Sequence, residues 1–243
     1  MTDAAPEGVR STPHGPSHHG GGVDLLLLSG FLAVAAVYVR AIAFTPVEAV
    51  QGPAQKILYV HATSAFVALY LAFALLAVCS GLYLWLRDEK LDRVAESAAE
   101  VGLAFTTVVL ITGPLWGKPI WGTWWTWDAR LTATLFLWFL ILGYLLLRGA
   151  VEERAMRARY SAVLGLLAAI LVPFIHLSVY LFRTLHPMPI VLKPDRPSLP
   201  WPMLATFLSF FVACGLLCAA LIRARYRYAL LRDALHARVA GDQ

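Results

Sequence analysis

The sequence predicts an all-α integral membrane protein, built as a bundle of six transmembrane helices. Hydrophobic residues make up 59% of the 243 positions, whereas charged residues make up only 14%. A soluble domain of this length has too little interior to bury so much apolar surface. The apolar residues also gather in six runs, each close to the length of about 20 residues that a helix needs to cross a bilayer.

The six predicted spans follow one another along the chain. Their approximate ranges are 24–44, 57–86, 99–115, 130–147, 160–182 and 202–222. The second span has no charge between Lys56 and Arg87, which corresponds to roughly 45 Å of helix. We therefore expect it to tilt or to project beyond the hydrocarbon. It also carries a stripe of small residues that allows close helix packing, at Ala65, Ala68 and Ala72.

The segments that flank the six spans are polar. Residues 1–23 are rich in Gly, Pro and His and lack the apolar core of a signal peptide, so we expect a disordered cytoplasmic tail. Residues 24–222 then form the transmembrane domain, and residues 223–243 a basic cytoplasmic tail. The polar stretch that begins at Arg232 is expected to fray.

The distribution of Lys and Arg predicts the orientation in the membrane. Roughly two thirds of the 20 Lys and Arg residues lie in the two termini and in the segments 87–98 and 148–159. Because the more positive side faces the cytoplasm, both termini are predicted to be cytoplasmic. Three segments then face outward: 45–56, 116–129 and 183–201. The same topology explains the net charge of +5 without a nucleic-acid partner.

The second outward segment contains an unusual concentration of tryptophan. Five of the eight tryptophans fall within it, at Trp116, Trp121, Trp124, Trp125 and Trp127. Tryptophan suits both membrane interfaces and the faces of planar ligands, so an interfacial aromatic belt is the alternative interpretation. A belt usually places one or two aromatic residues at a helix end. The density here favours a shelf for a flat molecule on the outer side.

Two histidines are predicted to lie at the level of this shelf. His61 stands in the first turns of the second span, and His186 follows the fifth. An ionisable residue at a membrane is costly and often functional. His176 lies ten residues before His186, about 15 Å deeper in a continuous helix, and a packing role is favoured for it.

Two imidazoles beside an aromatic shelf match the needs of haem. Haem iron takes two axial ligands, and imidazole is a common choice. Its propionates need cations, for which Arg130 is the best candidate, beside Lys118, Arg183 and Lys193. Asp128 begins the fourth span, where capping that helix or pairing with Arg130 is more plausible than ligand contact. Zinc would need three or four ligands, which this side of the protein does not offer.

Two other classes of membrane protein are possible from the residues alone. A b-type electron-transfer cytochrome would favour histidine pairs deep in facing helices, whereas only His176 is deep. A small-solute transporter would more often show broken helices and charges near the midplane, and here Arg40 and Glu48 lie near span ends.

The run from Trp121 to Thr132 resembles the "WWD" signature of haem-handling membrane proteins, and length and span number narrow this resemblance to the CcmC family. The sequences Tyr59–His61 and Arg183–His186 resemble the two histidine sites of that family. The resemblance implies a protein of the bacterial inner membrane that binds haem b on the periplasmic side, through the tryptophan loop and two axial histidines.

The resemblance also implies partners. Haem is delivered to the periplasmic haem chaperone CcmE and becomes covalently linked to one of its histidines. CcmA with CcmB then releases the loaded chaperone by ATP hydrolysis, and the small CcmD joins the assembly. A chain of this kind is a delivery and assembly factor more than an enzyme. This sequence has no ATP-binding loop, which agrees with a separate motor.

Overall fold

A computed structural model describes residues 24–191 and 193–241, and this part of the chain is helical without a named strand. Six helical stretches in it are long and apolar enough to cross a membrane. The predicted fold class is therefore confirmed. The elements are α1 Leu25–Ala43, η1 Pro53–Lys56, α2 Ile57–Phe66, η2 Val67–Ala72, α3 Phe73–Leu86, α4 Glu89–Trp121, α5 Ala129–Ala150, α6 Arg154–Leu181 and α7 Trp201–Gly241.

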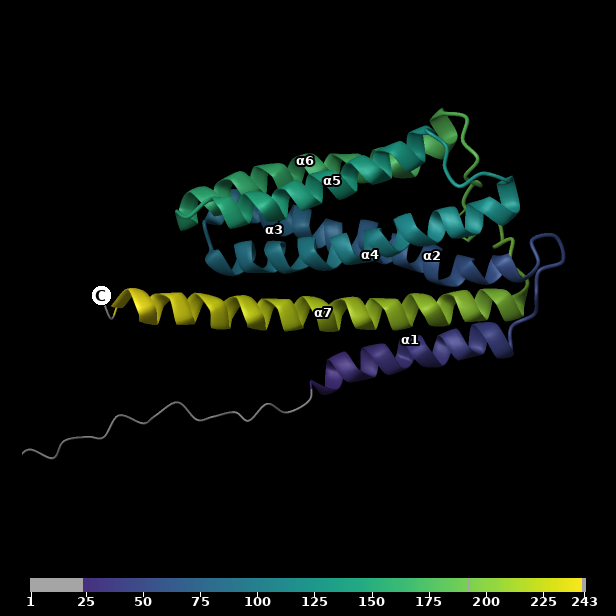
Figure 1. The fold of residues 1–243 in the computed structure, drawn as a ribbon, viewed down its shortest axis with the longest axis horizontal. Coiled ribbons are helices and arrows are strands. Elements are labelled where there is room, and N and C mark those ends of the chain that lie inside the picture. The colour runs from purple at the N-terminus through teal and green to yellow at the C-terminus, as the bar shows by residue number, and fades with distance from the viewer. Residues whose placement is uncertain (1–23, 192, 242–243) are drawn as a thin grey trace, which may run out of the picture.

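The helices lie side by side along one long axis (Figure 1). α2, η2 and α3 form one long rod, α5 pairs with α6, and α1 packs against α7. The connections α1–α2, α4–α5 and α6–α7 meet at one end of the bundle, which we call the loop end. The connections α3–α4 and α5–α6 and the end of α7 lie toward the opposite end, the tail end. All three segments predicted to face outward therefore lie together.

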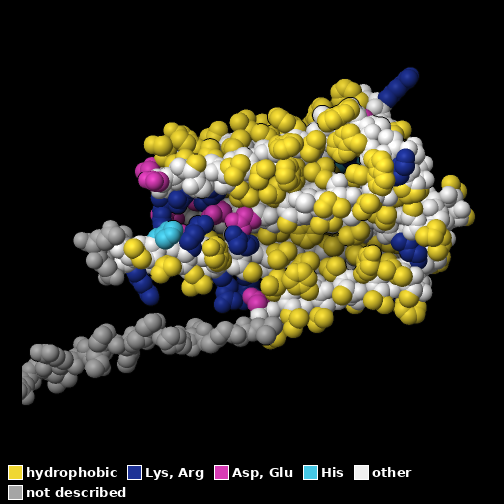
Figure 2. All heavy atoms as spheres, viewed as in Figure 1, with side chains coloured by type: hydrophobic (Ala, Val, Ile, Leu, Met, Phe, Trp, Pro, Cys, Tyr) yellow, Lys and Arg dark blue, Asp and Glu magenta, His cyan; other side chains and the backbone are white. Residues whose placement is uncertain are grey.

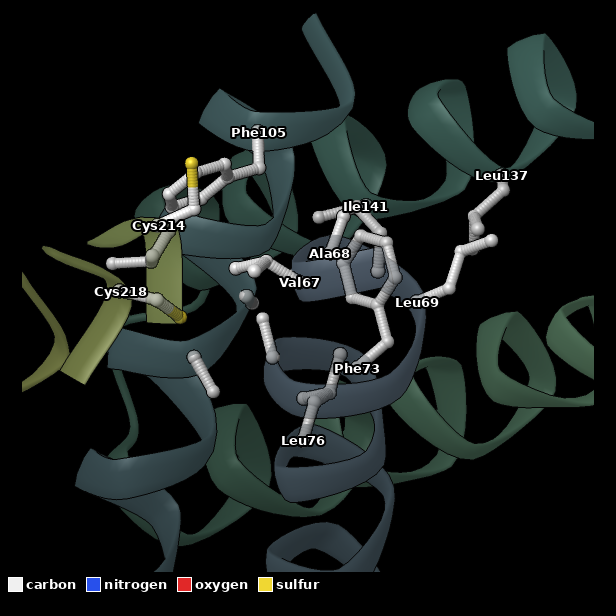
Figure 3. Close-up of a cluster of buried hydrophobic side chains, with 14 of the residues drawn as sticks. Val67, Ala68, Leu69, Phe73, Leu76, Phe105, Leu137, Ile141, Cys214 and Cys218 are labelled. Carbon is white, nitrogen blue, oxygen red and sulfur yellow. The ribbon is translucent and has the colours of Figure 1, made fainter. Parts of the chain in front are cut away.

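The core lies where the long rod meets its neighbours. Figure 3 shows Val67, Phe73 and Leu76 of the rod among side chains of other helices, including Ile141 and Cys214. Ala68 and Ala72 of the predicted small-residue stripe are fully buried, which confirms close packing at these two positions, whereas the third member, Ala65, is half-buried. Gly102 of α4 leaves room for the Phe73 ring.

The outer surface has the character of a membrane protein. Hydrophobic side chains cover the middle of the face of the bundle that Figure 2 shows, whereas Lys, Arg, Asp and Glu gather toward its ends. This face therefore presents a wide apolar zone between the two ends, as a bilayer requires.

Two helix boundaries differ from the prediction for the third span. α4 begins at Glu89 instead of 99, and it ends at Trp121 instead of 115. Asp88 caps its start by accepting from the backbone N–H of Lys90 at 2.8 Å, and Gly122 ends it with a φ of 75°. Hydropathy detects only the apolar part of such a helix, so its polar first turns were missed.

The last helix also continues beyond the predicted span. α7 runs to Gly241, so the expectation that the chain frays from Arg232 is wrong within the described residues. Arg232 pairs with Glu96 at 2.8 Å, and Asp233 pairs with Arg93 at 2.8 Å. These ion pairs fasten the end of α7 to the start of α4. The predicted disordered tail, residues 1–23, lies outside the described residues, and the proposed domain limits stay a prediction.

Candidate functional site

The structure brings His61 and His186 together at the loop end. Their ring centroids lie 6.3 Å apart and their planes are inclined by 32°. His61 is buried on the first turns of α2, and His186 is partly exposed in the segment between α6 and α7. Two histidines far apart in the sequence thus face one small region.

Two tryptophans complete a closed group of four rings with these histidines. Trp116 contacts His61 with a centroid distance of 5.7 Å, and Trp121 contacts His186 at 6.5 Å. The two indoles lie 6.4 Å from each other. We call His61, Trp116, Trp121 and His186 the aromatic quartet. The indole N–H of Trp116 donates to the side chain of Gln51 at 3.2 Å, which holds that ring in place.

The other three tryptophans of the predicted shelf lie outside the quartet. Trp124 and Trp127 are 56% and 77% exposed, and Trp125 packs against Trp127 with a centroid distance of 5.8 Å. They follow Gly122, where helix α4 has ended, so they extend the quartet toward the surface. The five tryptophans therefore divide into a helical pair within the quartet and an outer group of three. In this outer group Trp125 is half-buried and Trp124 and Trp127 are exposed.

A cavity of about 200 Å³ lies at the loop end of the bundle. Its lining includes both histidines of the quartet, and it continues inward to Tyr70 of η2 and His176 of α6. Most of the wall between these polar groups is apolar, with Ala65 of α2 as one example. The cavity is smaller than the roughly 300 to 1,000 Å³ of a typical small-molecule site, so a ligand as large as a porphyrin must extend beyond it.

Arg130 approaches the site from the first turn of α5. Its Nη1 donates to Nδ1 of His186 at 3.0 Å, and its Nε donates to the carbonyl of Ile175 at 3.3 Å. The burial of His186 and the nearby guanidinium lower the pKa of this imidazole to about 3. His186 is therefore neutral at physiological pH, which is the protonation state that a metal requires.

Asp128 caps helix α5. It accepts from the backbone N–H of Leu131 at 3.0 Å and from the hydroxyls of Thr126 and Thr184 at 3.2 Å and 2.7 Å. The structure thus favours the capping interpretation, since no ion pair joins Asp128 to Arg130, both of which the structure describes. The bond to Thr184 also ties the tryptophan segment to the segment that carries His186.

Sequence reasoning missed several partners of the histidines. Nδ1 of His61 lies 3.0 Å from the hydroxyl of Thr112 in α4, and a Cβ on Gly113 would come within 3.2 Å of the His61 ring. Nδ1 of His176 lies 2.5 Å from the hydroxyl of Tyr70. Such contacts depend on which helices become neighbours, and no local pattern reports them. The Tyr70 partner agrees with a packing role for His176.

The described residues, 24–191 and 193–241, contain no group of three or more His, Cys, Asp or Glu side chains placed to hold a metal ion. A bare metal ion such as zinc normally takes three or four protein ligands.

Comparison with known proteins points to one family. The family model described as "Heme exporter protein C" matches residues 21–240. The Haemophilus influenzae protein of that name is 38% identical over 197 residues, which are 80% of this chain and 79% of that protein. The Bradyrhizobium diazoefficiens protein is 37% identical over 207 residues, or 83% and 78% of the two chains. The Escherichia coli K12 protein is 36% identical over 162 residues, or 64% and 66%.

Proposed function

Because the chain belongs to the CcmC family, heme exporter protein C, we propose that it holds haem b between His61 and His186 and delivers it to a periplasmic chaperone. Membership implies haem delivery in cytochrome c maturation by a multi-pass membrane protein. The ligands, the haem type, the orientation and the chaperone, CcmE, belong to the proposal.

The distance between the two histidine rings is the observation that carries the proposal. An imidazole nitrogen binds a transition metal at about 2 Å, and the ring centre lies about 1 Å behind that nitrogen. Two imidazoles on opposite sides of one iron atom therefore have centres roughly 6 Å apart. The 6.3 Å between His61 and His186 agrees with this arrangement.

The surroundings of the histidines suit a planar apolar cargo. Trp116 and Trp121 flank the two imidazoles, and indole rings pack well against a porphyrin. Since the cavity is smaller than a whole porphyrin, we place one edge of the ring outside it, beyond the cavity-lining Trp124 and near the exposed Trp127. An exposed edge is what direct transfer to a chaperone needs.

Arg130 is placed to bind one of the haem propionates. In its present contact it donates to Nδ1 of His186, so the ring proton sits on Nε2. If Nε2 binds iron, the proton must move to Nδ1, and Arg130 must leave that atom. A propionate carboxylate is a stronger partner for a guanidinium than a neutral imidazole. We therefore assign Arg130 to a propionate, with Lys118, Arg183 and Lys193 as further cations.

The orientation and the partners follow from the same proposal. The loop end faces the periplasm and both termini face the cytoplasm of the bacterial inner membrane, because the Lys and Arg bias favours that direction. CcmE then meets the exposed tryptophans, and CcmA, CcmB and CcmD complete the assembly that releases it.

Absorption spectroscopy of the purified protein tests the proposal. We expect the spectrum of low-spin haem with two histidine ligands after growth with ample haem. His61→Ala and His186→Ala should each lose most of the haem, and added imidazole should restore part of it. His176→Ala is the matched control and should keep its haem. Wild-type haem content in both ligand variants would remove these histidines from the site.

A further inference from the structure

The contact between α4 and His61 assigns a role to a residue outside the aromatic quartet. We propose that Thr112 is a positioning residue that fixes the tautomer and the orientation of His61, so that Nε2 presents its lone pair to the iron. This inference rests on the proposed haem site. It concerns the tautomer and the orientation of His61 in the protein before haem binds.

The direction of the hydrogen bond follows from the contacts of the threonine. The Thr112 hydroxyl donates to the backbone carbonyl of Val108 at 2.7 Å, which is the usual bond of a helical threonine. Its only proton is thereby committed. The Thr112 oxygen, 3.0 Å from Nδ1 of His61, can then only accept, so Nδ1 must carry the ring proton.

A neutral imidazole has one proton and one lone pair on its two nitrogens. With the proton on Nδ1, the lone pair of His61 is on Nε2. Among the described residues, Nε2 has no hydrogen-bond partner, and His61 lines the cavity. The free nitrogen is therefore available on the side where the cargo would lie.

The rest of the α4 surface fits the same orientation. Gly113 follows Thr112, and a Cβ there would come within 3.2 Å of Cε1 of His61. Trp116, one turn further, packs edge-on against the ring. On α4, Thr112 thus supplies the hydrogen-bond acceptor for the His61 imidazole, Gly113 leaves room for the ring, and Trp116 packs against it.

The two proposed ligands are consequently unequal. Nδ1 of His61 donates to an acceptor on α4, whereas Nδ1 of His186 accepts from the side chain of Arg130. His61 needs no rearrangement to bind iron through Nε2, and His186 does.

The test compares three variants with the wild-type protein. Thr112→Val removes the acceptor and keeps the shape, Thr112→Ser keeps the acceptor, and Thr112→Ala removes the same oxygen without a new methyl group. Thr107→Val is the matched control, because Thr107 lies on the same helix, donates to the carbonyl of Leu103 at 2.8 Å and accepts from the indole N–H of Trp138 at 2.8 Å, but is not among the residues that line the cavity. Haem dissociation is measured by transfer to excess apomyoglobin, and the midpoint potential by spectroelectrochemical titration.

Loss of the acceptor should speed haem dissociation roughly 10-fold or more, as for other outer-shell partners of ligating histidines. It should also raise the midpoint potential, because an imidazole whose N–H is not hydrogen-bonded is a weaker donor to ferric iron. Thr112→Ser should stay close to wild type in both measurements, and Thr107→Val should match it. Wild-type dissociation and potential in Thr112→Val and Thr112→Ala would overturn the inference, as would an equal effect of Thr107→Val.

A second measurement needs no haem. Nitrogen-15 NMR of the histidine-labelled protein should show His61 protonated at Nδ1, with the signal assigned by its absence from His61→Ala. Protonation at Nε2 would overturn the inference. A wild-type protein without the two-histidine spectrum refutes the proposed function and this inference together, whereas a normal spectrum with unaltered Thr112 variants refutes only the inference.

Discussion

Arg148 is expected to be a major source of stability at the tail end. This residue lies near the end of α5, and its side chain is only 4% exposed. It binds both carboxylate oxygens of Asp92, at 2.6 Å and 2.9 Å, and one oxygen of Glu96 at 3.1 Å. Arg148→Met preserves the length and the apolar stem of the side chain while removing these bonds.

The expected magnitude follows from what each carboxylate keeps. Glu96 retains Arg232, at 2.8 Å and 3.0 Å, so its charge stays paired. Asp92 is 12% exposed and has no other ion-pair partner among the described residues. Breaking a buried pair costs about 3 to 5 kcal/mol, and the partial exposure of Asp92 puts the loss near about 3 kcal/mol. At about 2 to 4 °C per kcal/mol, the melting temperature should fall by roughly 10 °C.

The three free cysteines supply the assay. Cys79, Cys214 and Cys218 are all buried, so a thiol-reactive dye in detergent solution reports unfolding as they become exposed. The double variant Arg148→Met/Asp92→Asn removes the unpaired charge and should recover most of the lost stability. A melting temperature of Arg148→Met within about 2 °C of wild type, or no recovery in the double variant, would refute the reasoning.

Three further predictions use the same preparations. Gly30→Ala should cost about 1 to 3 kcal/mol in the dye assay, because its Cβ would lie 3.0 Å from the Cα of Leu217 in α7. Gly143→Ala is the control, because a Cβ there meets open space, and it should leave the stability unchanged or raise it by up to about 1 kcal/mol. An equal loss of stability in Gly30→Ala and Gly143→Ala would contradict the close contact between α1 and α7. Gly113→Ala should displace His61 and lower the haem absorbance per protein, and unchanged absorbance would show that the ring has room to move. The pKa of His186 is lowered in the folded protein from 6.5 to about 3, so the unfolded chain binds a proton that the folded chain does not. The stability from this group is present above pH 6.5 and is lost as the pH falls toward 3. Between pH 7 and pH 5, the melting temperature of His186→Gln should therefore fall less than that of the wild-type protein. Equal falls in the two proteins would count against this account.

The site could be predicted in part from local features. Tryptophan density marked the segment from Trp116 to Trp127, and counting the spans put His61 and His186 on one side of the bundle. Neither feature shows which rings touch. Trp116 and Trp121 belong to the quartet because α4 stays helical as far as Trp121. Trp127 lies beyond the end of this helix, is exposed and does not belong to the quartet. Thr112 carries no signal at all in a sequence, since a threonine in an apolar helix is common.

The sequence by itself determined the number of spans, because burying a long apolar run in lipid depends on its length and composition and not on its neighbours. It also determined the candidate ligands, because few ionisable residues are tolerated at such positions. Only the tertiary structure decided where α4 begins and where α7 ends, since the charges of Asp92, Glu96 and Arg232 are compensated by partners on other helices. It likewise decided the partner of each imidazole, because hydrogen bonds between helices depend on distances that no single helix contains.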